Sequence, residues 1–258
     1  NVTPDSFSGD GLLAAGGDPV DAAVARARAM VADGADLLDV GGESSRPGHA
    51  EIPAADEAAR VVPVVAALRA ALPDTPIAVD TVKPAVAEAA IGAGADLLND
   101  VWGTAPDDEV AAVAAAHRVP IVLMHNRAEP RYVNLLAEIV ADLQAAIDRA
   151  LRVGVPWDAV IVDPGFGFGK TPDHNLALLD DLATLRLLGR PVLLGTSRKS
   201  TLGRVLDLPP GERVEATVAT TVLGIRAGVD IVRVHDVRAN VRAARMTDAV
   251  VRRGTPTS

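Results

Sequence analysis

Short apolar runs alternate with Ala-rich stretches of helical period along the whole chain. The runs are rich in Val, Ile and Leu at consecutive positions, which is typical of a strand buried on both faces of a parallel sheet. Several helical stretches lead into the next run through a glycine, as in "DGAD", "GAGAD" and "AGVD". A glycine at this position ends a helix before a strand begins. The alternation therefore predicts an α/β protein with a parallel sheet.

We count seven predicted strands, which end near Gly42, Thr81, Asp100, His125, Gly165, Ser197 and Asp236. Eight helices are predicted over 18–33, 54–72, 84–94, 107–118, 133–153, 174–188, 212–227 and 236–253. The first helix has no strand before it, so we expect an eighth strand that lies largely upstream of Asn1. That strand would complete a (β/α)8 TIM barrel, a single domain over 1–258. The alternative is a doubly wound open sheet, which needs no further strand.

Composition excludes several classes of function. The 258 residues are 49% apolar, enough for a large core, and contain no cysteine for a disulfide, a thiolate metal site or a thiol nucleophile. No apolar run approaches the roughly 20 residues of a membrane span, and no signal peptide is visible. We therefore expect a cytoplasmic protein with no membrane partner. The net charge of −9 argues against a nucleic-acid partner.

The stretch "VDPGFGFGKT", residues 162–171, has alternating glycines and then Gly-Lys-Thr. The P-loop pattern requires a glycine where Pro164 stands. The dinucleotide pattern requires its third glycine where Lys170 stands. The loop resembles a phosphate cradle but matches neither pattern, so its role depends on its place in the fold.

Polar residues follow the predicted strands, and in a barrel the carboxyl ends of the strands form the active site. Asp80, Asn99 and Asp163 would bring carboxylates and an amide to one mouth. Such acceptors suit the amidine-like edge of a heterocycle such as a pterin or guanine. The alternative is that these residues cap helices or hold neighbouring loops.

Arg233 and His235 stand two positions apart on a strand, so both side chains point to one face. This pair suits a phosphate, and a salt bridge to a loop carboxylate is the alternative. The stretch "TSRKS", 196–200, offers hydroxyls, two cations and a predicted helix start, all favourable for an anion. Barrel phosphate sites often use the loops after the seventh and eighth strands, where both groups fall.

Taken in order, "NVTPDSFS", "DVGGESSRPG", "VDT", "ND", "DPGFGFGK", "SRKS" and "RVHD" resemble the dihydropteroate synthase family over nearly the whole chain. The resemblance implies a TIM-barrel transferase of folate synthesis, the target of sulfonamides. Such an enzyme joins 6-hydroxymethyl-7,8-dihydropterin diphosphate to p-aminobenzoate and releases 7,8-dihydropteroate and diphosphate. The resemblance also implies Mg²⁺ as cofactor and a homodimer built on the late helices, within 212–253.

Site residues follow from the same resemblance. Those matching the pterin site are Asp80, Asn99, Met124, Asp163 and Lys199. Those matching the diphosphate site are Asn1, Ser45, Arg233 and His235, with Asn1 also near Mg²⁺. Those matching the p-aminobenzoate side are Phe7, Arg46, Pro47, Phe168, Lys199 and Ser200. Those expected to take part in catalysis are Asp5, Lys199, Arg233 and His235, with Asp5 ordering the first loop and the metal.

The implied reaction is a dissociative loss of diphosphate, during which two loops, 1–11 and 43–50, close over the site. Thr201 stands where the family often has a larger residue, which predicts looser packing behind Lys199. Pterin-binding methyltransferases of corrinoid enzymes are one alternative, but they lack the diphosphate motifs. A non-catalytic pterin-binding paralogue is another, but it should show damage in the first two loops, which here read intact.

Overall fold

The computed structural model describes residues 1–2, 18–44, 51–103, 105 and 107–253. Its strands are β1 (Leu38–Gly41), β2 (Ile77–Asp80), β3 (Leu97–Asp100), β4 (Ile121–Met124), β5 (Val160–Asp163), β6 (Leu193–Leu194) and β7 (Ile231–Val232). Strands β1 to β5 form one parallel sheet in chain order, and β6 pairs with β7 in parallel. A parallel bridge between Val162 and Val192 connects the two groups. All seven predicted strands are therefore present.

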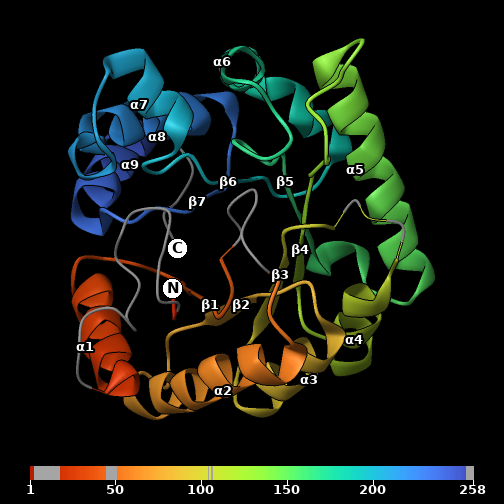
Figure 1. The fold of residues 1–258 in the computed structure, drawn as a ribbon. Helices are drawn as coiled ribbons and strands as arrows, with labels where there is room; N and C mark the ends of the chain where they lie inside the picture. The colour runs from red at the N-terminus through yellow and green to blue at the C-terminus, as the bar shows by residue number, and fades with distance from the viewer. Residues whose placement is uncertain (3–17, 45–50, 104, 106, 254–258) are drawn as a thin grey trace.

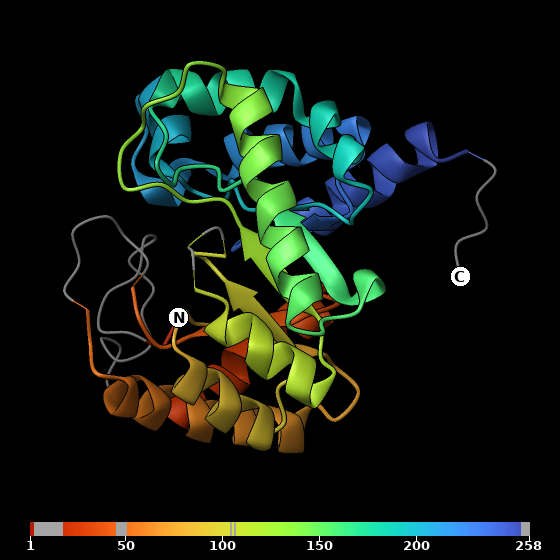
Figure 2. The same ribbon diagram turned by 90° about the vertical axis from the view of Figure 1, so that its right-hand side faces the viewer.

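Helices surround these strands in chain order (Figure 1). They are α1 (Pro19–Ala32), α2 (Ala54–Ala71), α3 (Pro84–Gly92), α4 (Glu109–His117), α5 (Leu135–Arg152), α6 (Pro172–Asp180), α7 (Ser200–Leu206), α8 (Val214–Ala227) and α9 (Val237–Val251). Figure 2 shows α5 running along the outside of the molecule, where it packs against β4 and β5. A doubly wound sheet reverses its strand order at a switch point. The sequential order seen here is that of the predicted barrel.

Two helices differ from the sequence prediction. The helix predicted over 174–188 is α6 followed by the 3-10 helix η3 (Leu182–Leu188), with a break at Asp181, where φ is −124° and ψ is 39°. Two aspartates, Asp180 and Asp181, stand at this point. Their negative charges are unfavourable beside the C-terminal end of α6, which is the negative end of the helix dipole. The short helix α7 was not among the eight predicted helices. It nevertheless begins at Ser200, where "TSRKS" predicts a helix start.

The core lies between the strands and their helices. Ile77, Leu98, Ile121 and Val160 are fully buried, as expected for strands with apolar residues on both faces. None of the helices in the described part of the chain is long and apolar enough to cross a membrane.

The N-terminus lies beside the first strand. Val2 donates its backbone N–H to the carbonyl of Gly41 at 2.8 Å. A cavity of about 740 Å³ begins beside the N-terminus and extends between β1 and β7, past Leu37 and Ile231. This is where a further barrel strand would fit, and a strand ahead of Asn1 stays a prediction.

Candidate active site

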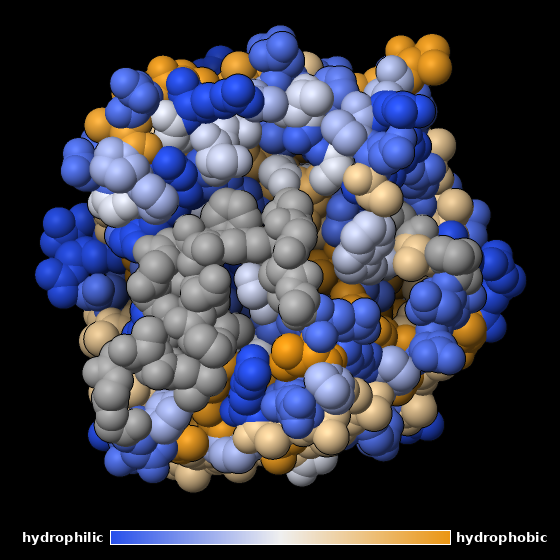
Figure 3. All heavy atoms as spheres, viewed as in Figure 1, coloured by the Kyte–Doolittle hydropathy of each residue, from blue (hydrophilic) through white to orange (hydrophobic). Residues whose placement is uncertain are grey.

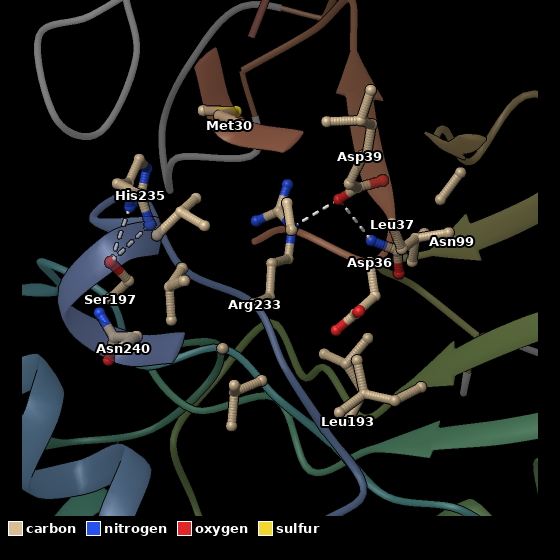
Figure 4. Close-up of a pocket in the computed structure, with 18 of the residues that line it drawn as sticks. Met30, Asp36, Leu37, Asp39, Asn99, Leu193, Ser197, Arg233, His235 and Asn240 are labelled. Atoms are coloured by element: carbon tan, nitrogen blue, oxygen red, sulfur yellow. Dashed lines mark hydrogen bonds and ion pairs between the residues drawn. The ribbon is translucent and has the colours of Figure 1, made fainter. Parts of the chain in front are cut away.

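Arg233 lies at the centre of the site, where it forms ion pairs with Asp39 of β1 and Asp80 of β2. Figure 4 shows the contact with Asp39. The Nε of Arg233 donates to Asp39 Oδ2 at 2.5 Å, and its Nη2 lies 3.3 Å from Asp80 Oδ2. These two carboxylates, Asp39 first, raise the pKa of Arg233 above its ordinary value. The predicted alternative of a salt bridge is thus partly right, although both partners stand at strand ends.

Asp39 organises the residues around it. Its Oδ2 accepts from Asn99 Nδ2 at 3.2 Å as well as from Arg233. Its Oδ1 is buried with no hydrogen-bond partner among the described residues. Burial and the neighbouring Asp39 charge raise the pKa of Asp80 to about 7, against the opposing effect of Arg233. The mouth therefore contains a carboxylic acid that is half ionised near neutral pH.

Lys199 and Asp163 lie on the other side of this mouth. Lys199 stands directly before α7, and its Nζ donates to the carbonyl of Phe166 and lies 4.3 Å from the centre of the Phe168 ring. Burial lowers the pKa of Lys199 to about 8, while Asp163 opposes that shift. Asp163 ends β5 and accepts the N–H of Gly165 at 2.7 Å. Burial raises the pKa of Asp163 too, and Lys199 is the strongest opposing charge.

The glycines of the 162–171 stretch allow two close approaches. Gly165 has a φ of +68°, and a Cβ there would lie 1.8 Å from the carbonyl oxygen of His125. Gly167 has a φ of +84°, and a Cβ there would lie 2.9 Å from Lys199 Cδ. Only glycine adopts such angles and leaves this space without strain. The glycines therefore let the loop pack closely against His125, which follows β4, and against Lys199. Neither contact indicates a phosphate cradle.

Thr201 connects this loop to the helix that follows Lys199. The N–H of Gly167 donates to Asn175 Oδ1 at 2.8 Å, and Asn175 Nδ2 donates to Thr201 Oγ1 at 3.0 Å. Asn175 and Thr201 are each 2% exposed. The Thr201 hydroxyl thus completes a buried hydrogen-bond chain, and the looser packing expected behind Lys199 stays a prediction.

Replacing Thr201 with valine is expected to destabilise the protein by about 1–3 kcal/mol, because the buried Nδ2 of Asn175 loses its acceptor. Guanidinium unfolding measures the change. Thr201→Ser keeps the acceptor and is the matched control. A valine variant as stable as the serine variant would show that this hydrogen bond contributes nothing.

His235 is held by Ser197. Its backbone N–H donates to Ser197 Oγ at 3.1 Å, and its Nδ1 lies 2.8 Å from the same oxygen. Arg198, which follows Ser197, forms a bidentate ion pair at 2.9 and 2.6 Å with Asp236, which follows His235. This ion pair holds the two segments together. Arg233 and His235 both line the cavity, but so does Val234 between them, and all three follow the end of β7 at Val232, so their position does not rest on a shared strand face. On the face seen in Figure 3, hydrophilic side chains border a hollow near the centre.

Comparison with known proteins identifies the family. Residues 1–235 match the family of pterin binding enzymes. The chain is 49% identical over 254 residues to the dihydropteroate synthase of Clostridium beijerinckii, covering 98% of this chain and 93% of that protein. The chain belongs to the dihydropteroate synthase family. As a member of that family it is an enzyme of the transferase class.

Solved structures of dihydropteroate synthases have the same fold. The Clostridium difficile enzyme, solved in the presence of pteroic acid, has a TM-score of 0.92 at 45% identity over 98% of this chain and 95% of that chain. The Xanthomonas albilineans enzyme with 4-aminobenzoic acid has a TM-score of 0.91 at 40% identity over 99% and 92% of the two chains. The predicted barrel and the predicted family are confirmed.

The structure brings most of the predicted dihydropteroate synthase residues to one mouth. Those lining the cavity are Asn1, Asn99, Phe168, Lys199, Arg233 and His235. Asp80 and Asp163 end their strands and interact with Arg233 and Gly165. Their individual roles toward a ligand stay predictions.

Four predicted residues in the described part of the chain do not line the cavity: the strand-end residues Asp80 and Asp163, and also Met124 and Ser200. Met124 is 3% exposed at the end of β4, where it is paired in register with Asp163. Ser200 is exposed on the first turn of α7. Neither is among the described residues that line the cavity. The predicted residues Asp5, Phe7, Ser45, Arg46 and Pro47 lie outside the described residues.

The contacts that Asp39 and Ser197 make within the site were not predicted; of the two, only Ser197 had an expected role, as one of the hydroxyls of 196–200 favourable for an anion. Asp39 lies within β1 and Ser197 shortly after β6, and their place near the end of an apolar run was the available signal. Asp39 holds Arg233 and Asn99, and Ser197 holds His235. The fold decides which side chains meet within the barrel, so the sequence alone could not show these contacts.

Proposed function

We propose that this enzyme condenses 6-hydroxymethyl-7,8-dihydropterin diphosphate with p-aminobenzoate to give 7,8-dihydropteroate and diphosphate. The observation that carries the proposal is the arrangement around Arg233. A half-buried cation stands between two carboxylates, and Lys199 and His235 line the same cavity. Carboxylates for a pterin edge and cations for a diphosphate are thus within one mouth.

The pterin edge would take its hydrogen bonds from the strand-end residues Asp80, Asn99 and Asp163. The carboxylate oxygens of the two aspartates and the amide oxygen of Asn99 can accept the N–H groups of an amidine-like edge, and the buried setting strengthens such bonds. Arg233, already placed beside Asp80, would bring its charge to the diphosphate side of the same ligand. His235, held by Ser197, would donate to the diphosphate oxygens.

The proposed reaction is dissociative. The bond between the pterin methylene carbon and the diphosphate oxygen breaks, and both electrons leave with the oxygen. Arg233 and His235 stabilise the negative charge that develops there. The dihydropterin ring delocalises the cation left on the methylene. The amine nitrogen of p-aminobenzoate then forms the new C–N bond and releases one proton, so no covalent bond to the enzyme forms.

Mg²⁺ fits the donor set at this mouth. In phosphate-transfer sites Mg²⁺ binds through one or two protein oxygens, substrate phosphates and waters. Asn1 lines the cavity and offers one amide oxygen, and among the described residues no cluster of three His, Cys, Asp or Glu could form a protein cage. When bound, Mg²⁺ would neutralise part of the diphosphate charge. We propose Asn1 as its protein ligand.

We also propose that the enzyme is a homodimer through its late helices. Leu223 on α8 and Met246 and Val250 on α9 are exposed apolar residues, at 51%, 66% and 49%. Sedimentation should give twice the monomer mass, and Leu223→Glu should shift the equilibrium toward monomer. A monomeric wild-type protein would contradict this proposal.

Pterin binding is expected to show a bell-shaped dependence on pH. The pKa of Asp80 is raised to about 7, so its carboxylate forms, and affinity rises, as the pH passes upward through 7. The pKa of Lys199 is lowered to about 8, so its charge, and with it affinity, is lost above that pH. Titration calorimetry across pH 5–10 measures both limbs. In Lys199→Met the alkaline fall should disappear, while the acid limb should remain and move to higher pH because Asp163 loses the charge that lowers its pKa.

Product formation tests the proposed function. The purified protein, given both substrates and Mg²⁺, should form dihydropteroate, and neither substrate alone should give it. Product should fall sharply in Arg233→Ala. Pterin binding without product would contradict the proposal and favour a non-catalytic pterin-binding protein.

A further inference from the structure

Lys170 lies behind the glycine loop, and its ammonium group has three hydrogen-bond partners. Its Nζ lies 3.0 Å from His125 Nδ1 and 3.1 Å from each of the carbonyl oxygens of Gly165 and Phe168. An ammonium group carries three N–H donors and no acceptor. Burial lowers the pKa of Lys170 to about 7, and Asp163 opposes that shift. In the ammonium form each donor of Lys170 has one acceptor, and all three acceptors belong to the loop or to His125 behind it.

His125 is fixed as an acceptor toward Lys170. His125 is fully buried, and its Nε2 lies 3.1 Å from Asp142 Oδ2. The same oxygen accepts from Arg127 at 2.7 and 3.0 Å, so Asp142 Oδ2 is a hydrogen-bond acceptor. Nε2 must then carry the proton, which leaves the lone pair of Nδ1 for Lys170. Burial, then the charge of Lys170, lowers the pKa of His125 to about 3, in keeping with a neutral ring.

The loop is thereby held between two lysines. Lys170 binds the carbonyls of Gly165 and Phe168 from behind, and these two residues close a turn with a hydrogen bond of 3.0 Å from Phe168 N–H to Gly165 O. Lys199 binds the carbonyl of Phe166 and lies over the Phe168 ring at the front. Phe168 and Lys199 line the cavity, whereas Lys170 does not.

We propose that Lys170 is a positioning residue for the second substrate: by holding the Gly165–Phe168 turn it fixes the Phe168 ring against Lys199. This inference rests on the proposed synthase function. Of the proposed pterin-side residues, Asp80 and Asn99 take their positions from β2 and β3. The charge of Lys170 reaches Asp163, but it affects the pKa of that carboxyl less than the charge of Lys199 does. The effect of Lys170 should therefore concern the aniline substrate far more than the pterin.

The test is Lys170→Met, which keeps the length of the side chain and removes its donors. We expect the KM for p-aminobenzoate to rise at least tenfold while the dissociation constant for the pterin diphosphate, measured by calorimetry, changes less than threefold. Tyr132→Phe is the matched control, since it removes the 2.8 Å hydrogen bond to the carbonyl of Gly169 at the far end of the same loop. Its KM for p-aminobenzoate should change less than that of Lys170→Met.

A second variant covers a failure of Lys170→Met to fold. Asp142 is 35% exposed, and Asp142→Asn can donate to His125 Nε2, which moves the ring proton to Nδ1 and removes the acceptor of Lys170. The KM for p-aminobenzoate should rise a few-fold, with pterin affinity unchanged. Equal losses of affinity for both substrates, or an unchanged KM for p-aminobenzoate in a folded variant, would overturn the inference. A wild-type protein that makes no product overturns the proposed function first, and this inference with it.

Discussion

Lys199→Met should lower kcat/KM for dihydropteroate formation by about 10³-fold, the loss that follows removal of one preorganised charge from a water-poor site. The ammonium group of Lys199 donates to the carbonyl of Phe166 and lies over the Phe168 ring. It also interacts electrostatically with the Asp163 carboxylate. Methionine fills the space without replacing the charge. The buried carboxyl of Asp163 then loses its strongest stabilising charge and shifts toward the neutral form, which cannot accept from a pterin N–H.

Steady-state kinetics with both substrates measures this loss. Arg204→Met is the matched control because Arg204 is exposed on the same short helix and should keep wild-type activity. If Lys199→Met retained a tenth of the wild-type activity, Lys199 would be a structural residue and the proposed assignment of the mouth would be wrong.

Gly165→Ala should destabilise the protein by at least about 3 kcal/mol, among the large effects that single substitutions cause. A left-handed conformation costs a residue with a Cβ about 1–2 kcal/mol. In addition, the new Cβ would lie 1.8 Å from the carbonyl oxygen of His125, whose own N–H donates to Asp163 O at 2.8 Å. Neither backbone can move without disturbing the ends of β4 and β5.

Calorimetry should therefore record a fall in Tm of roughly 6–12 °C for a chain of this size. Gly92→Ala is the control, since Gly92 lies in α3 and a Cβ there meets nothing within 4 Å. Its Tm should be unchanged or higher. A Gly165→Ala variant with the Tm of the control would mean that this loop relaxes freely, which would also contradict the inference on Lys170.

The sequence is informative about strands and about the mouth of the barrel for one physical reason. Buried parallel strands must be apolar on both faces, so a polar residue such as Asp80 or Asp163 at the end of a run marks where the strand meets the site. Helix ends are less clear, because the break at Asp181 depends on packing as well as on local charge.

Partners within the site could not be predicted. The ion pair between Arg233 and Asp39 joins residues 194 positions apart, and the hydrogen bond between Asn175 and Thr201 depends on how α6 approaches α7. The looser packing expected behind Lys199 from the size of Thr201 stays a prediction. The hydrogen bond that the Thr201 hydroxyl accepts could not be predicted, because the fold supplies its buried partner.

The ion pairs of Arg233 also affect the order in which the protein comes apart. Strands β1 to β5 each pair with their neighbour in the chain, whereas Arg233 meets Asp39 and Asp80 across separations of 194 and 153 residues. Such distant contacts carry the largest cost in chain entropy and form after the local ones. A partial opening that parts Arg233 from Asp39 and Asp80 therefore dismantles the site while the sheet of β1 to β5 is still intact.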